Sequence, residues 1–204
     1  MTQTNVPASR RAAEDAARFR EIFEHIERSD AVNQRGLAAE LGVALGLVNA
    51  YVARAVDKGW VKVQHIPARR YRYYLTPKGF AEKSRLTLQY LNDSFVALRR
   101  ARASFERLYD ALAKEGVRRV ALAGDDDLVD IAVLAALGGP VEVVGVANPL
   151  GPARRTRGVP VVEPGAGIAE VWVIASTKRA REVRAALSSV VPGARIVAPD
   201  VLPR

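Results

Sequence analysis

The chain has no cysteine and only two histidines among its 204 residues. Without cysteine it can form no disulfide, no thiolate redox sensor and no cysteine-based zinc site. His25 and His65 cannot build a metal centre unless several carboxylates converge on them, so we expect no bound metal. No nucleophile, histidine and acid arrangement is recognisable. We therefore expect a binding protein and not an enzyme.

Long apolar runs are also missing. The longest run, around Val117–Ala123, has the length of a strand and is far too short for a membrane span. The N-terminal residues contain no apolar segment of the kind found in secretory signals, and we expect residues 1–15 to be disordered. These absences indicate a cytoplasmic protein without a membrane partner.

Positive charge is in excess and unevenly distributed. The chain has 31 basic and 22 acidic side chains, a net charge of +9, and Lys58–Arg85 alone contributes eight basic residues against one acid, Glu82. Such a cluster is typical of a phosphate-binding surface. From Val117 onward there are eleven basic and nine acidic residues. The two halves are therefore expected to have different roles.

The order helix, helix, turn, helix and hairpin is predicted for residues 16–76. Apolar residues at helical spacing predict a first helix that ends near Ser29–Asp30. Asn33 is a suitable N-cap for a second helix, Gln34–Leu41, which turns at Gly42. A third helix, Ala44–Lys58, ends at Gly59.

Two β-runs follow the third helix. Trp60–His65 and Tyr71–Leu75 flank a turn that contains Pro67, Arg69 and Arg70, which predicts a β-hairpin with a basic tip. A hairpin used only for protein contacts is the alternative, but it would have no need for adjacent arginines without a nearby acid.

Residues 18–85 resemble the winged-helix regulators of the MarR type. The resemblance lies in NQRGLAAELGVALGLVNAYVARAVDKGWVKV followed by YRYYLTPKG, and above all in the Gly42 turn, the KGW exit and the LTPKG after the hairpin. It implies an α+β winged helix-turn-helix domain that binds double-stranded DNA. The recognition helix would be Ala44–Lys58 and the wing Ile66–Arg72.

The recognition helix contains few residues that can read bases. Of the residues expected to face base edges, Gly46, Asn49, Ala50 and Ala53 with Leu47 near them, Asn49 alone can make a bidentate contact, which favours adenine. Phosphate contacts are therefore expected to supply most of the affinity. The predicted DNA-contacting residues are Asn33, Gln34, Arg35, Ala44, Gly46, Asn49, Ala50, Arg54, Lys62, Arg69, Arg70, Arg72 and Lys78.

A single long helix, Pro77–Lys114, is predicted within the segment 77–115. Thr76 is placed to cap it and Pro77 suits its first position. Its apolar residues alternate steps of four and three, the spacing of a coiled-coil seam. We expect this seam to form a homodimer, the alternative being that the helix packs on its own C-terminal domain. The predicted interface residues are Leu88, Leu91, Phe95, Leu98, Phe105, Tyr109 and Leu112.

Residues 117–204 alternate strands with helices and so predict a small α/β, Rossmann-like domain with a parallel sheet. The expected helices are Asp127–Leu137 and Lys178–Val190. The expected strands lie within residues 118–124, 139–148, 158–162, 169–176 and 194–202.

A winged helix followed by a small Rossmann domain resembles the layout of the redox-sensing repressors called Rex, as do GVPVV and IVAPDVL. The resemblance implies that a nicotinamide dinucleotide controls DNA binding. The dinucleotide loop departs from the G-x-G-x-x-G pattern, however, because only Gly124 is kept while Asp126 and Val129 replace the other glycines. Asn148 replaces the acid that would hold the ribose. We therefore expect no nicotinamide cofactor.

Three roles stay open for this domain: binding another small ligand, contacting a partner, or holding a cation at Asp125, Asp126, Asp127 and Asp130. Arg154, Arg155 and Arg157 either clamp an anion or are solvated. Ser176 and Thr177 either meet a ligand or only cap the following helix. The candidate ligand residues are Gly124, Asp125, Asn148, Ser176 and Thr177.

These observations favour a sequence-specific DNA-binding transcriptional regulator that acts as a homodimer, with a C-terminal sensor or assembly domain. One alternative is a weakly specific, architectural DNA-binding protein. Another is a protein-interaction module that has lost DNA binding, against which the basic wing argues.

Overall fold

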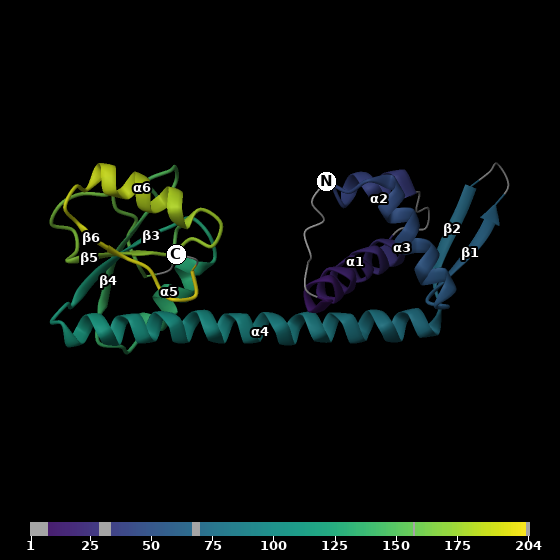
Figure 1. The fold of residues 1–204 in the computed structure, drawn as a ribbon, viewed down its shortest axis with the longest axis horizontal. Helices are drawn as coiled ribbons and strands as arrows, with labels where there is room; N and C mark the ends of the chain where they lie inside the picture. The colour runs from purple at the N-terminus through teal and green to yellow at the C-terminus, as the bar shows by residue number, and fades with distance from the viewer. Residues whose placement is uncertain (1–7, 29–33, 67–69, 157, 203–204) are drawn as a thin grey trace. The chain divides into compact units, whose positions relative to one another are not determined.

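The computed structural model describes residues 8–28, 34–66, 70–156 and 158–202. The chain divides into two compact units, 1–94 and 95–204, and helix α4 (Pro77–Lys114) contributes residues to both. The structure is α+β with one long helix and a parallel sheet (Figure 1). Each unit is described by itself.

The first unit has the predicted order of elements. They are α1 (Ala8–Arg28), α2 (Gln34–Glu40), α3 (Leu45–Asp57), β1 (Val61–Ile66), β2 (Arg70–Leu75) and the first half of α4. One expectation is corrected, because α1 begins at Ala8 and residues 8–15 are helical instead of disordered. Within this stretch, Asp15 contacts Tyr51 and Arg54 of α3. The predicted cap Asn33 and the predicted end at Ser29–Asp30 lie outside the described residues.

The core of this unit is built on α1. Phe19 and Phe23 are buried and pack edge-on against Trp60, with ring centroids 5.1 and 5.8 Å from it. Gly59 ends α3 with φ 69°, a left-handed conformation that favours glycine. The apolar residues of α2 and α3 close the core from the other side; they are Leu37, Ala38, Val48, Val52 and Ala55.

Helices α2 and α3 form a bent pair with an angle of 115°, which is within the range of helix-turn-helix motifs. By length and composition alone, this bent pair could also form a broken membrane span. No single helix among the described residues is long and apolar enough to cross a membrane.

Helix α4 begins as predicted at Pro77. The hydroxyl of Thr76 accepts a hydrogen bond of 3.0 Å from the Gly79 amide, which confirms Thr76 as the N-cap. The same hydroxyl donates to the carbonyl of Gly59, at 2.6 Å. The start of α4 is therefore tied to the chain that leaves α3.

The second unit is a parallel sheet with helices on both faces. Its elements are the second half of α4, β3 (Arg119–Ala123), α5 (Leu128–Ala136), β4 (Glu142–Ala147), β5 (Val171–Ile174), α6 (Ala180–Val190) and β6 (Arg195–Val197). The strand order is β4-β3-β5-β6. Figure 1 shows α6 on one face and α5 with α4 on the other. Strand β5 is buried along its whole length, as expected for a sheet covered on both sides.

The third strand predicted in this unit, within residues 158–162, does not form. These residues make only isolated bridges, a parallel one between Val161 and Val146 and an antiparallel one between Val159 and Thr156. Proline at position 160 has no amide hydrogen to extend a ladder, which accounts for the short pairing. The bridge between Val161 and Val146 lies at the outer edge of β4, where a further parallel strand would pair.

The predicted seam of α4 divides into two parts with different environments. Phe105, Tyr109 and Leu112 are buried in the core of the second unit, and the Tyr109 hydroxyl donates to the carbonyl of Ala132 on α5. Burial raises the pKa of Tyr109 well above its usual value. These three residues therefore belong to the chain's own core and do not form the predicted dimer interface.

Candidate functional site

The exposed surface of α3 combines small residues and one amide with the apolar side chains of Leu45 and Leu47, which are 37% and 44% exposed. Asn49, Ala50, Gly46 and the preceding Ala44 are all exposed. The opposite face is buried, because Val48, Tyr51, Val52 and Ala55 recur at helical spacing and pack on the core. The structure thus presents four of the predicted DNA-contacting residues together on one helix and its entry.

The hairpin also has one buried and one outward face. Lys62 pairs with Tyr74 and Gln64 pairs with Arg72, so the four alternate residues share a face. On the other face, Val61 and Tyr73 are buried. The outward face is therefore basic, and Arg72 donates a hydrogen bond of 3.3 Å to the Tyr74 hydroxyl within it.

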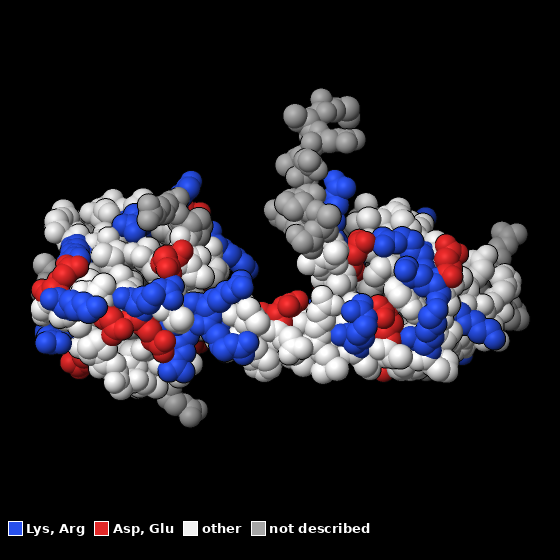
Figure 2. Space-filling model, turned by 60° about the horizontal axis from the view of Figure 1, so that its bottom comes forward, with Lys and Arg blue, Asp and Glu red and all other residues white. Residues whose placement is uncertain are grey.

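Lys62 on the hairpin and Lys78 at the start of α4 are exposed. Within the described part of the chain, no carboxylate lies within ion-pair distance of either ammonium group. Arg35 is exposed on α2. Figure 2 shows basic side chains over the visible faces of both units, with acidic side chains among them. Lys62 and Lys78 are free to meet phosphate.

Two predicted DNA contacts have partners within the chain. The guanidinium of Arg54 binds the carboxylate of Asp15 at 2.9 Å and lies over the rings of Phe19 and Tyr51. Gln34 donates a hydrogen bond of 2.9 Å to the hydroxyl of Tyr73. Arg54 and Gln34 thus also join α1, α2, α3 and the hairpin, and their contact with DNA stays a prediction.

Three further predicted DNA contacts are described only in part or not at all. Asn33, before α2, and Arg69, at the hairpin tip, lie outside the described residues. Arg70 is described by its backbone alone, which pairs with Ile66. Sequence reasoning missed Gln64 and Tyr74 on the outward face. Strand alternation from Lys62 and from Arg72 would have identified both.

In the second unit, the five predicted ligand residues follow β3, β4 and β5. Gly124 is in close contact with the neighbouring strand end, because a β-carbon there would lie 1.9 Å from the carbonyl oxygen of Ala175. Ser176 is fully buried and donates to the carboxylate of Asp125 at 3.1 Å. The ends of β3 and β5 are therefore closed against each other.

Asp126 connects the same two strand ends. One of its carboxylate oxygens accepts bonds of 2.6 Å from both the amide and the hydroxyl of Thr177, and the other accepts from the amide of Leu128 at 3.0 Å. Burial acts to raise the pKa of Asp126, but these bonds and one from the Lys178 amide hold it below its usual value. A carboxylate of the chain itself thus occupies the place where an anionic ligand would accept these amide hydrogens.

The remaining ligand and cation candidates also have partners within the chain. Asn148 closes its own turn, accepting from the Leu150 amide and donating to the Pro152 carbonyl. Arg154 binds the carboxylates of Asp127 and Asp130 at 2.8 and 2.7 Å. Among the described residues no group of three histidine or acidic side chains is arranged to hold a metal ion. The polar side chains among the predicted ligand residues are therefore already hydrogen-bonded within the chain.

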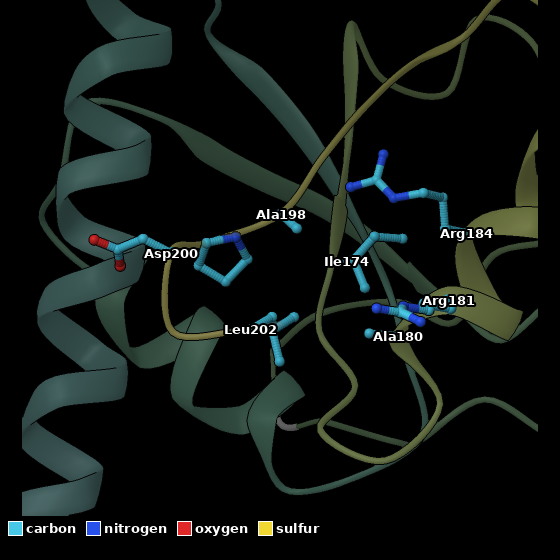
Figure 3. A pocket seen from close by; sticks show the side chains of 8 residues that line it. Ile174, Ala180, Arg181, Arg184, Ala198, Asp200 and Leu202 are labelled. Atoms are coloured by element: carbon cyan, nitrogen blue, oxygen red, sulfur yellow. The ribbon is translucent and has the colours of Figure 1, made fainter. Parts of the chain in front are cut away.

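A cavity of about 520 Å³ lies at a different place, between α6 and the chain that follows β6 (Figure 3). None of the five predicted ligand residues lines it. Its lining comes from Ile174, Ala180, Arg181, Arg184, Ala198, Pro199, Asp200 and Leu202.

Among the solved structures that match this chain are two whose similarity to it is weak. No protein-family model matches the chain, and neither does any curated protein. A MarR family transcription regulator matches at 20% identity, covering 50% of this chain and 81% of that one, with a TM-score of 0.35. A structure titled PigF with SAH matches at 13% identity, covering 93% of this chain and 73% of that one, with a TM-score of 0.33. Neither is a Rex repressor, and that resemblance stays a prediction.

One sequence-based interpretation is corrected by the second match. The lack of a recognisable catalytic arrangement led us to expect that the chain is not an enzyme. A structure that holds SAH matches over most of the chain, so the exclusion of enzymatic activity is withdrawn.

Proposed function

We propose that this chain is a DNA-binding transcriptional regulator of the winged-helix kind that acts as a homodimer. The observation that carries the proposal is the basic outward face of the hairpin beside an exposed α3. Lys62 and Lys78 are exposed and form no ion pair among the described residues, while Gly46, Asn49 and Ala50 of α3 are exposed and uncharged. Helix α3 would enter the major groove, and the hairpin would contact the phosphate backbone.

The dimer would use the part of the α4 seam that the second unit leaves uncovered. Leu88, Leu91, Phe95 and Leu98 are 62%, 43%, 54% and 41% exposed and follow the same alternation of four and three. Apolar side chains in such a continuous stripe are typical of a helix that pairs with another. The same stripe of a second copy provides a self-complementary surface. The second unit would sense a small molecule or stabilise the assembly.

The small side chains on α3 favour a second candidate function. Gly46 and Ala50 carry no hydrogen-bonding side chain, and Asn49 is the one amide on this face of α3. A protein with this surface would bind DNA chiefly through phosphates and would discriminate poorly between sequences. That behaviour is typical of an architectural DNA-binding protein.

Selection of bound sequences from random duplex DNA separates the two candidates. A regulator is expected to enrich one motif and to bind it at least about a thousandfold more tightly than bulk DNA. An architectural protein is expected to enrich none while still binding. No binding to any duplex at low salt would refute both.

Matched variants sharpen this experiment. Asn49→Ala should remove the preference at one adenine position of the motif, whereas Lys62→Ala should weaken binding to all sequences alike. If both variants weakened all sequences equally, α3 would not be the element that reads bases.

A further inference from the structure

The cavity beside α6 lies at the carboxyl ends of β5 and β6. Ile174 is the last residue of β5, and Ala198 follows the end of β6. Open parallel sheets bind their ligands at this edge. Its volume of about 520 Å³ is within the range of small-molecule sites. A second space of about 280 Å³ shares Ala180 and Arg181 with it and continues along the start of α6.

The cavity has an apolar floor. Ile174 is fully buried in the sheet, and Leu202 is 7% exposed. Ala180 and Ala198 present only methyl groups from the two sides. A ligand seated here would cover apolar surface, which favours a hydrocarbon or aromatic body.

Arg184 brings positive charge to the cavity. Figure 3 shows the side chains of Arg181 and Arg184 extending from α6 toward Ile174. The guanidinium of Arg184 donates to the backbone carbonyl of Ile196 at 3.0 Å, a contact that fixes its position without neutralising its charge. No carboxylate among the described residues forms an ion pair with Arg184.

The one acid in the lining does not offset this charge. Asp200 points toward α4 in Figure 3, where it binds the guanidinium of Arg107 at 2.8 Å and accepts a hydrogen bond from Ser104. These two contacts also hold the pKa of Asp200 below its usual value, so it stays ionised and paired. Its charge is therefore directed to α4 and away from the cavity.

We propose that this cavity binds a small organic carboxylate with an apolar body, the carboxylate on Arg184 and the body on Ile174 and Leu202. The inference rests on the sensing role proposed above for the second unit and specifies the class of ligand. Arginine suits this task because its planar fork matches a carboxylate and keeps its charge at all physiological pH.

The test is calorimetric titration of the full chain, without DNA, with benzoate and octanoate. Their uncharged counterparts, benzamide and octanamide, are the matched probes. Saturable binding of at least one carboxylate is expected, at least about tenfold tighter than its amide, because a hydrogen-bonded charge is replaced by a neutral group. Since no DNA is present, a failure to bind carboxylates would leave the DNA-binding proposal intact. A failure to bind DNA would likewise leave the carboxylate site intact.

Three variants locate the site. Arg184→Gln should weaken carboxylate binding by about ten- to a hundredfold, Arg184→Lys should keep part of it, and Ala180→Leu should reduce octanoate binding by filling the cavity. Arg155→Gln, at an exposed arginine that does not line the cavity, is the control and should change nothing. The proposal is overturned if neither carboxylate binds at millimolar concentration, if each amide binds as well as its acid, or if Arg184→Gln binds like the parent. The comparison of acid with amide needs no variant, so a variant that fails to fold does not remove the test.

Discussion

The carboxylate of Asp15 on α1 lies 2.9 Å from the guanidinium of Arg54 on α3 and also accepts a hydrogen bond from Tyr51. The Arg54 contact and the Tyr51 hydroxyl hold the pKa of Asp15 below its usual value. One acid near the start of α1 thus fixes a basic side chain that the sequence alone assigned to DNA. Asp15 therefore neutralises a positive charge on the proposed recognition helix.

Replacing this acid is expected to change both stability and DNA affinity. Asp15→Asn should destabilise the first unit by no more than about 1 kcal/mol, because both partners are well exposed to solvent. It should raise affinity for any duplex a few-fold, since Arg54 loses its counter-ion. Fluorescence anisotropy with labelled DNA measures this effect. Asp110→Asn makes the same change of net charge at an exposed site in the second unit, and an equal gain there would contradict a local role for Asp15.

Binding to DNA should depend strongly on salt. If each subunit of a dimer contacts roughly three to five phosphates, the slope of log affinity against log salt is expected to be about −5 to −9. Lys62→Ala should make that slope shallower by about 2, one phosphate for each subunit. Lys178→Ala is the control at an exposed lysine of the second unit. A parent-like slope for Lys62→Ala would remove the hairpin from the phosphate-contacting surface.

The exposed stripe of α4 should hold the dimer. Leu98→Asp is expected to dissociate it, because each fully buried leucine contributes about 1.5–3 kcal/mol and a charge in its place adds a desolvation cost. Sedimentation velocity over a range of concentrations checks this result. Leu134→Asp introduces the same change at a 51% exposed leucine on α5 and should leave the assembly unchanged. A parent-like dimer in Leu98→Asp would mean that another surface pairs the subunits.

Asp126→Asn should destabilise the second unit by about 1–3 kcal/mol, since its carboxylate accepts three hydrogen bonds from Thr177 and Leu128. Because the pKa of Asp126 is lowered in the folded chain, its contribution is present above the unfolded value near 4 and is lost as pH falls through the folded value. The difference from the parent is therefore expected at pH 7 and should shrink at pH 3.

Urea unfolding followed by tryptophan fluorescence is the measurement for this variant. Each unit contains one tryptophan, Trp60 in the first and the buried Trp172 in the second. In a Trp60→Phe background the signal reports on the second unit alone. A deficit that stayed the same at both pH values would show that the charge of Asp126 is not what stabilises the loop.

Nicotinamide dinucleotides should not bind at micromolar concentration. Their pyrophosphate needs the amides that Asp126 already occupies and space that Gly124 and Ala175 fill. Calorimetric titration with NAD, NADH and their phosphorylated forms checks this. A micromolar dissociation constant would require the loop to open on binding, and Asp126→Asn should then bind more tightly than the parent.

Most elements of the fold could be predicted because their ends have local causes. Thr76 and Pro77 begin α4 and Gly59 ends α3 in the structure, as the sequence indicates. The division of the α4 seam could not be predicted, because the same apolar period suits a partner helix and a sheet. Phe105 packs on the sheet, whereas Phe95 stays exposed. This difference depends on where β3 and α5 lie, and the residue pattern of α4 contains no information about their positions.

The candidate site was predictable only where exposure follows from local periodicity. Asn49 and Lys62 are exposed because helix and strand spacing place their neighbours in the core. Arg54 lies 39 positions from Asp15, and Asp126 lies 51 positions from Thr177. Contacts over such separations arise from tertiary packing, so a charge that looks available in the sequence is already bound in the fold.

The hydrogen bond from the Thr177 amide to Asp126 competes with the binding of a free anion at this edge of the sheet. An anion from solution that seeks the Thr177 amide competes with a carboxylate attached to the same molecule. Intramolecular groups compete at effective concentrations on the order of millimolar or above, and the tethered group is never diluted. Only an anion present at comparable concentration, or one with many more contacts, can displace it. The end of β3 is therefore expected to bind a free anion only weakly while the Asp126 carboxylate accepts the Thr177 amide hydrogen.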